Sequence, residues 1–133
     1  IWLILLSPVG LILTGKKSVA LHAAFSAFIV LLLGELFKSY FFVQRPFIRD
    51  LLPPAVPFLL DGSFPSNHTA VSFAISFSIF RSHIRFGLFL LVLSVLIGAS
   101  RVLVRVHYPI DVLGGIILGL LVSKITGKIV FRH

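Results

Sequence analysis

Long apolar stretches alternate with short polar turns along the chain. The stretches 19–37, 86–104 and 109–125 are each long enough to cross a bilayer core of about 30 Å as a helix. The stretches 1–14 and 69–80 are apolar too, but short for a complete crossing. This pattern predicts an all-α, polytopic transmembrane helix bundle with about five spans. Because the first stretch has the character of a helix end, we also expect an N-terminal helix to be missing from this sequence.

The composition supports a membrane protein. Hydrophobic residues make up 58% of the chain and charged residues 12%, whereas about a quarter of a soluble domain is charged. No polar segment is long enough for a separate domain, so residues 1–133 are predicted to form one integral membrane domain. The chain has no cysteine, which excludes disulfides and thiolate metal sites. Basic residues cluster between apolar stretches, so the net charge of +8 favours membrane topology over nucleic-acid binding.

Alternating spans sort the charged residues onto two membrane faces. One face receives basic residues and no acid: Lys16, Lys17, Arg81, Arg85, Lys124, Lys128 and Arg132. The other face receives five basic residues and all four acids: Lys38, Arg45, Arg49, Arg101, Arg105, Glu35, Asp50, Asp61 and Asp111. Positive charge is enriched in cytoplasmic loops. The first face is therefore predicted to be cytoplasmic and the second to face the extracytoplasmic side of the plasma membrane.

The stretch 100–111, SRVLVRVHYPID, places three ionisable residues between two apolar spans. Such residues are costly near a bilayer and often mark a functional site. Arg101 is a fixed cation suited to phosphate, and His107 is a possible nucleophile or proton carrier. A helix that begins near Pro109 can turn the Asp111 carboxylate back toward the imidazole. The group suggests phosphoryl chemistry, and a basic patch that faces lipid headgroups is the alternative.

A basic pair and a proline-rich connection follow the second apolar stretch. Lys38 is expected to pair with Glu35 on one helix face. Arg45 would lie on the same face as Lys38, about 10 Å away, if the helix continued that far. The connection 46–64 mixes prolines with apolar residues and is predicted to lie on the membrane surface. A connection of this length suggests a lid or lipid gate, with a passive connector as the alternative.

A third motif, FPSNH at 64–68, has the signature of a helix start. Ser66 or Asn67 is expected to cap the exposed backbone amides. A helix N-terminus is a ready anion site, and His68 would lie in its first turn. The motif therefore predicts a second contribution to a phosphate site.

Taken in order, the three motifs resemble the signature of the type 2 phosphatidic acid phosphatase family: Lys38-x6-Arg45-Pro46, then Pro65-Ser66-Asn67-His68, then Ser100-Arg101-x5-His107-x3-Asp111. The resemblance in motifs runs from Lys38 to Asp111. It departs at Asn67, where many members have glycine; asparagine keeps the backbone N–H and tolerates unusual dihedral angles. Members usually have six spans, against about five counted here.

The resemblance implies a mechanism and a set of site residues. His107 would attack phosphorus and become a phosphohistidine, Asp111 would fix its tautomer, and His68 would protonate the leaving oxygen and then activate water. The phosphoryl oxygens would be bound by three cations and by a helix start: Lys38, Arg45, Arg101, Ser66 and Asn67. Because these cations can neutralise the phosphate and the few acids are scattered, no metal or other cofactor is expected. A metal held by Asp50 and Asp61 is the weaker alternative.

Within the family, FPSNH followed by HYPID looks most like the undecaprenyl diphosphate phosphatases. A lipid phosphate and the bilayer are the expected partners, with phosphatidylglycerol phosphate and phosphatidic acid as rival substrates, and no nucleic acid. A non-catalytic lipid-binding or transport protein that only holds phosphate is the alternative from another class. A soluble haloperoxidase has a related anion pocket, but continuous spans argue against it. The oligomeric state is not readable from the sequence.

Overall fold

The computed structural model describes residues 1–51 and 61–130, and over these residues the chain is all-helical with no strand. Six helices follow in order: α1 (Trp2–Leu13), α2 (Lys17–Tyr40), α3 (Pro46–Arg49), α4 (Asn67–Phe80), α5 (Ile84–Leu103) and α6 (Pro109–Val130). The lid or gate expected within 46–64 falls largely on residues 52–60, which lie outside the described residues. Arg132, which the sequence assigns to the cytoplasmic face, also lies outside them.

Three of these helices, α2, α5 and α6, are long and apolar enough to cross a membrane. Helix α1 has 12 residues and α4 has 14, so both are shorter than a full crossing. Large apolar side chains on α2, α5 and α6 point outward, which suits lipid as their surroundings. The all-helical membrane fold is thus confirmed, whereas the predicted count of about five spans is not.

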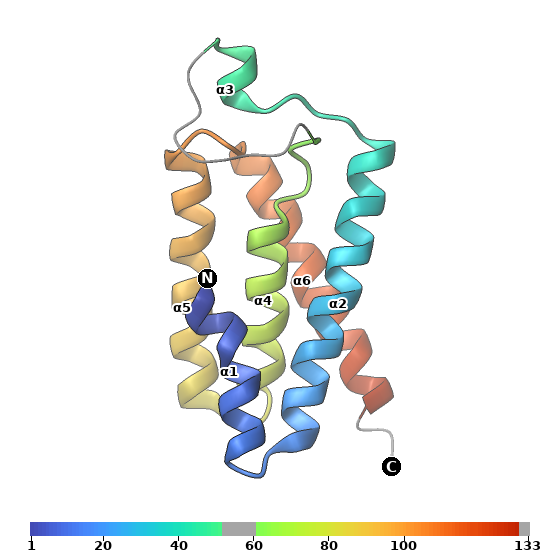
Figure 1. Cartoon of the computed structure of the whole chain (residues 1–133), viewed down its shortest axis with the longest axis vertical. Coiled ribbons are helices and arrows are strands. Elements are labelled where there is room, and N and C mark those ends of the chain that lie inside the picture. Colours follow the sequence, from blue (N-terminus) through green and yellow to red (C-terminus); the bar gives the residue numbers. More distant parts are fainter. Residues whose placement is uncertain (52–60, 131–133) are drawn as a thin grey trace.

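Helix α4 lies at the centre of the bundle, surrounded by α1, α2, α5 and α6 (Figure 1). Ten of its 14 residues are buried. Helix α6 approaches it closely through Gly115 and Gly119: a Cβ at Gly115 would lie 2.7 Å from the Ser66 carbonyl oxygen, and one at Gly119 would collide with the Ala70 carbonyl. Because α6 carries Asp111 in its first turn, this close packing helps fix the position of that carboxylate.

A polar cluster joins α2, α4 and α6 inside the bundle. We define it as His22, Ser26, Ser78, Ser123 and Thr126, all of which are buried. The Ser26 and Thr126 hydroxyls are 2.6 Å apart, the Ser78 and Ser123 hydroxyls are 2.7 Å apart, and His22 Nε2 lies 3.0 Å from the Ser123 carbonyl oxygen. Hydrogen bonds of this kind hold helices together where apolar packing gives little preference over lipid.

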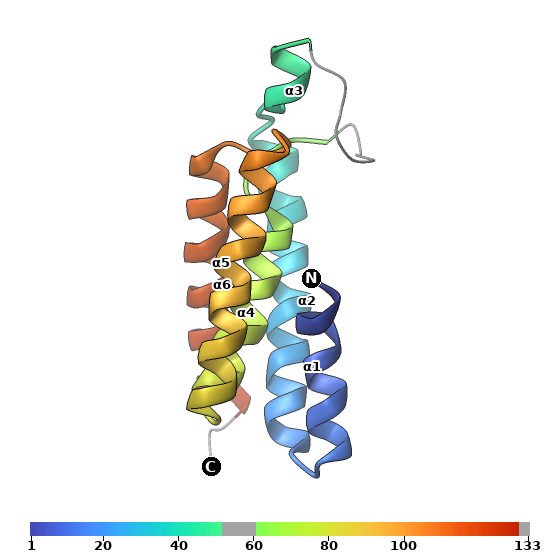
Figure 2. The same ribbon diagram turned by 90° about the vertical axis from the view of Figure 1, so that its left-hand side faces the viewer.

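The turns between helices lie at two opposite ends of the bundle (Figure 1). The α1–α2 and α4–α5 turns and the end of α6 share one end. The α2–α3 and α5–α6 connections share the other, where α3 stands clear of the long helices (Figure 2). The predicted division of the loops between two ends is therefore confirmed for the described residues. The polar cluster lies toward the first end, and the three ionisable motifs lie toward the second.

Candidate active site

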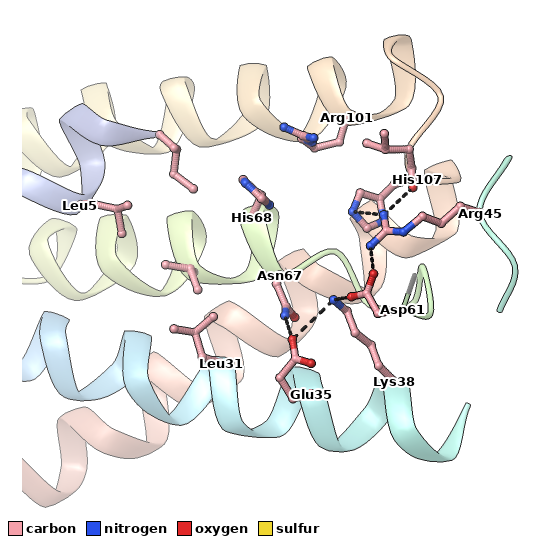
Figure 3. Close-up of a pocket in the computed structure, with 13 residues that line it drawn as sticks. Leu5, Leu31, Glu35, Lys38, Arg45, Asp61, Asn67, His68, Arg101 and His107 are labelled. Carbon is pink, nitrogen blue, oxygen red and sulfur yellow. Dashed lines mark hydrogen bonds and ion pairs between the residues drawn. The ribbon is translucent and has the colours of Figure 1, made fainter. Parts of the chain in front are cut away.

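A cavity of about 530 Å³ is lined by residues of α1, α2, α4 and α5 and of the connections between helices (Figure 3). All three sequence motifs contribute to its wall. The lining combines ionisable and amide side chains with an apolar portion: Glu35, Lys38, Arg45, Asp61, Asn67, His68, Arg101 and His107, with Ile1, Leu5, Leu31, Val71 and Val106. The structure thus brings together, in one place, residues that are remote in sequence.

The two cations of the first motif reach the cavity by different routes. Helix α2 ends at Tyr40, so the single helix considered for Lys38 and Arg45 is not formed. Arg45 has extended backbone, with φ −65° and ψ 147°, because the ring of Pro46 disfavours helical geometry in the preceding residue. Its guanidinium Nη1 donates to the Val106 carbonyl at 2.9 Å, which fastens the side chain to the α5–α6 turn. Both cations are nonetheless buried, at 8% exposure for Lys38 and 7% for Arg45.

Asp61 bridges these two cations. Its Oδ2 accepts a hydrogen bond from Lys38 Nζ at 2.5 Å, and its Oδ1 accepts one from Arg45 Nη2 at 2.6 Å. Burial raises the pKa of Asp61, but the hydrogen bonds from Lys38 and Arg45 outweigh it, and the pKa lies below its ordinary value. The carboxylate is therefore ionised at neutral pH. The predicted Glu35–Lys38 pair is also present, at 3.5 Å.

The weaker expectation of a metal held by Asp50 and Asp61 does not fit this geometry. Asp61 is engaged by the two cations, and Asp50 pairs with Arg49 at 3.0 Å. Across residues 1–51 and 61–130, no three His, Asp or Glu side chains are grouped so that they could hold a metal ion.

His107 lies between a carboxylate and a guanidinium. As the sequence predicts, α6 begins at Pro109 and turns Asp111 back, so that His107 Nδ1 is 3.5 Å from Asp111 Oδ2. The carboxylate is fully buried, and the Tyr108 backbone N–H donates to it at 2.8 Å. On the other edge of the ring, Nε2 is 3.5 Å from Arg45 Nη1. At this distance the Nδ1 contact is longer than a hydrogen bond.

The protonation of His107 follows from the same surroundings. Burial lowers the pKa of the imidazole, Asp111 opposes that shift, and the positive charge of Arg45 adds to it, so the pKa lies below its ordinary value. The ring is therefore neutral at neutral pH. A neutral imidazole has a free lone pair on one nitrogen, which a nucleophile requires.

Two further predicted residues line the same cavity. His68 lies in the first turn of α4, with its ring directed into the space beside Arg101 (Figure 3). Arg101 lies in the last turn of α5. Among the described residues, the buried Nε atoms of Arg101 and Arg45 have no hydrogen-bond partner. Buried donors without a partner are rare, and two in one cavity suit an anionic ligand.

The FPSNH motif forms the predicted helix start but is arranged differently in detail. Ser66 is the N-cap of α4, yet within the described part of the chain its side chain makes no cap bond. Its hydroxyl instead accepts from Thr69 at 3.0 Å, and its backbone N–H donates to the Asp111 carbonyl at 3.0 Å. Ser66 is fully buried and lies outside the described lining of the cavity. It therefore joins α4 to α6 behind the site.

Asn67 does line the cavity, and its position depends on two residues of α2. Its side-chain nitrogen donates to Glu35 Oε1 at 2.6 Å. A Cβ at Gly34 would collide with the Asn67 side chain. A lone glycine directly after the large apolar residues 29–33 is the sequence signal that could have indicated this close approach.

Fold and site together define an integral membrane protein with a polar, anion-suited cavity at one end of a helix bundle and a carboxylate-paired histidine in its wall. The chain belongs to the PAP2 superfamily, whose family model matches residues 19–133. This membership is the resemblance expected from the three motifs.

Individual relatives carry more specific names. The chain is 31% identical over 110 residues to undecaprenyl-diphosphatase BcrC of Bacillus subtilis (strain 168), covering 83% of this chain and 57% of that protein. It is 35% identical over 111 residues to bacitracin transport permease protein BcrC of Bacillus licheniformis, covering 81% of this chain and 54% of that protein. The chain thus spans little more than half the length of these curated relatives.

A solved structure has the same fold. It is the crystal structure of a transmembrane PAP2 type phosphatidylglycerolphosphate phosphatase from Bacillus subtilis. The TM-score is 0.73 at 27% sequence identity, and the match covers 96% of this chain and 66% of that chain. The packing of the helices around α4 is therefore shared with a membrane phosphatase.

Proposed function

We propose that this protein is a metal-independent lipid phosphate or diphosphate phosphatase whose preferred substrate is undecaprenyl diphosphate. One observation carries the proposal: His107 has Asp111 at 3.5 Å from Nδ1 and Arg45 at 3.5 Å from Nε2, in the wall of a cavity. That arrangement aims the second nitrogen at the place where cations would hold a phosphoryl group. The name of the Bacillus subtilis relative supports the choice of lipid.

In the proposed reaction, His107 Nε2 attacks phosphorus while Lys38, Arg45 and Arg101 hold the phosphoryl oxygens. The bond from phosphorus to the leaving oxygen breaks, and that oxygen takes a proton from His68 in its protonated form. Burial and the positive charge of Arg101 lower the pKa of His68 to about 4, and the negative charge of the bound phosphoryl group opposes that shift and favours the protonated ring. His68 then takes a proton from water, the water oxygen attacks phosphorus, and the phosphorus–nitrogen bond breaks. Asp111 stabilises the positive imidazole that forms in the first step. Phosphate and the dephosphorylated lipid leave.

Further parts of the proposal concern Asn67, the domain and the membrane side. Asn67 contributes to binding through its place in the cavity wall, whereas the position of Ser66 suits support of α4 and Asp111. Residues 1–133 act as a single membrane phosphatase domain. The site faces the extracytoplasmic side of the plasma membrane, because the opposite end carries basic residues such as Lys16 and Arg81 and no acid among the described residues.

Two alternatives have observations in their favour. The similar solved structure is that of a phosphatidylglycerolphosphate phosphatase, which favours phosphatidylglycerol phosphate as substrate, and phosphatidic acid has the same terminal phosphate chemistry. The name of the Bacillus licheniformis relative, a transport permease protein, favours a transport protein. In this chain, such a protein would use the cations to hold a lipid phosphate without hydrolysing it. Both alternatives would use the same cations as the proposed phosphatase. Substrate preference distinguishes the other phosphatases from it, and the absence of turnover would identify a transport protein.

The experiment is to measure phosphate release by the purified protein in detergent from each of the three lipids, with EDTA present. We expect the highest kcat/KM with undecaprenyl diphosphate and no loss on adding EDTA. Quenched reactions with labelled lipid should contain protein-bound phosphate that is acid-labile, as a phosphohistidine is, and that is absent from His107→Asn. Faster release from phosphatidylglycerol phosphate would favour that substrate. Lipid binding with no release from any of the three would contradict the enzyme proposal.

A further inference from the structure

Asp61 holds a position in the cavity that neither the motifs nor the proposed mechanism accounts for. Its two carboxylate oxygens contact two cations, Lys38 at 2.5 Å and Arg45 at 2.6 Å. These two cations are the residues of the first motif that are predicted to bind phosphate. The side chain is 24% exposed, so water can reach the carboxylate while the cations themselves are buried at 8%.

The contacts of Asp61 use donors that a phosphoryl group would need. Arg45 directs Nη1 to the Val106 carbonyl and Nη2 to Asp61. Lys38 has Asp61 on one side and Glu35 at 3.5 Å on another. A phosphoryl oxygen binds such donors at about 2.7–2.9 Å, close to the distances at which the Asp61 oxygens lie. Carboxylate and phosphoryl oxygens cannot both accept from the same N–H groups at that distance. While Asp61 holds them, a phosphoryl group has only the remaining donors of these cations, such as Arg45 Nε.

Arg101 differs from the other two cations. It lines the same cavity, but among the described residues it forms no ion pair with an acidic group. Its positive charge is therefore available to an incoming anion from the start, whereas the charge of Lys38 and Arg45 is balanced in part by Asp61. Phosphate binding at this site is accordingly an exchange of one anion for another at two of the three cations.

We propose that Asp61 is an affinity-determining residue, which competes with the phosphoryl group for Lys38 and Arg45 and so weakens the binding of inorganic phosphate. The inference rests on the proposed function, because it assumes that these cations bind a phosphoryl group. In an enzyme that releases phosphate, such a competitor shortens the time for which the product occupies the site. The substrate loses the same binding free energy at these two cations, but its lipid part adds contacts in the apolar portion of the cavity that inorganic phosphate lacks.

The test compares Asp61→Asn with wild type by titrating inorganic phosphate into the detergent-solubilised protein in a calorimeter. Asparagine keeps the shape of the side chain and removes its charge. We expect the Kd for phosphate to fall about tenfold, between the effects typical of exposed and buried ion pairs. The matched control is Asp50→Asn, since Asp50 is a neighbouring acid that pairs with Arg49; its Kd should stay within about twofold of wild type.

The opposite outcome has a definite meaning. If the Kd for phosphate is unchanged or rises in Asp61→Asn, Asp61 serves to hold Lys38 and Arg45 in place, and the inference is overturned. Asp61→Ser repeats the test with a smaller neutral side chain, and size-exclusion chromatography checks that each variant is folded. Failure of both variants to fold would likewise assign Asp61 a structural role.

The titration does not depend on turnover, so the two proposals fail separately. A wild-type protein that binds phosphate but hydrolyses no lipid contradicts the proposed function and leaves the Asp61 test in force. A wild-type protein that binds no phosphate contradicts the anion site and overturns the inference with it. For an active enzyme, inhibition by phosphate gives a second readout: its inhibition constant should fall in Asp61→Asn by the same factor as the Kd.

Discussion

Two buried histidines lie toward opposite ends of the bundle, and their surroundings differ in chemistry. His22 is fully buried in the polar cluster, where its Nε2 lies beside the Ser123 carbonyl and its ring packs against Gly127. His107 is 4% exposed, with a carboxylate on one edge, a guanidinium on the other and a cavity in front. Burial alone therefore does not distinguish them. His22 has a cation nearby as well, since Arg81 and the His22 ring both lie close to Gly127. The carboxylate beside the ring and the cavity that the ring faces are what set His107 apart.

Replacing each histidine by asparagine is expected to show the largest difference between the two sites. For His107→Asn we expect kcat to fall by about 10³-fold or more, because the nucleophile is lost, while phosphate still binds in calorimetry. For His22→Asn we expect kcat/KM to stay within about threefold and thermal stability to fall, by about 1–3 kcal/mol, because a buried polar contact is weakened. Equal loss of turnover in two folded variants would contradict the distinction between the two histidines.

A second comparison uses an arginine from each end. Arg101 lines the cavity, whereas the Arg81 guanidinium lies near Gly127 beside the polar cluster. In Arg101→Gln we expect kcat/KM to fall by about 10²–10³-fold, the effect of removing one group that stabilises transition-state charge. In Arg81→Gln we expect a change of less than about threefold. Steady-state kinetics on the preferred lipid measures both, and a large loss in Arg81→Gln alone would move the functional site to the other end.

Short-range regularities made much of this site predictable. The lengths of the apolar stretches placed the long helices, and alternation of spans placed the three motifs at one end. The return of Asp111 toward His107 needs only a helix start at Pro109 and a separation of four residues. Each of these follows from local chain geometry, so no knowledge of the tertiary packing was required.

The features that the sequence did not reveal depend on distant parts of the chain. Asp61 is 23 residues from Lys38, and no local pattern around either residue predicts their contact. Ser66 faces Asp111 because α6 packs closely on α4, which no local pattern around residue 66 specifies. Pro46 predicts that α2 ends before it, and α2 ends at Tyr40. The extended backbone of Arg45, which takes its side chain to the α5–α6 turn, was not predicted.

The smallest expected effect concerns the protonation of His107. Burial and Arg45 lower its pKa and Asp111 raises it, so the net value lies below the ordinary 6.5. The neutral, nucleophilic ring is therefore kept as pH falls toward 6.5 and is lost only below that value. Removing each neighbour should shift the pKa in opposite directions: Arg45→Gln should raise it, and Asp111→Asn should lower it further.

Nitrogen NMR of histidine-labelled protein in detergent measures this titration directly, with the His107 signal assigned by its absence in His107→Asn. The direct measurement is needed because a phosphate substrate itself gains a proton near pH 6, which distorts the acid limb of kcat/KM. A His107 pKa at or above 6.5 in wild type, or shifts of the same sign in the two variants, would contradict the electrostatic account. It would also weaken the contrast with His22, since that contrast rests on charged neighbours acting on the ring of His107 from its two edges.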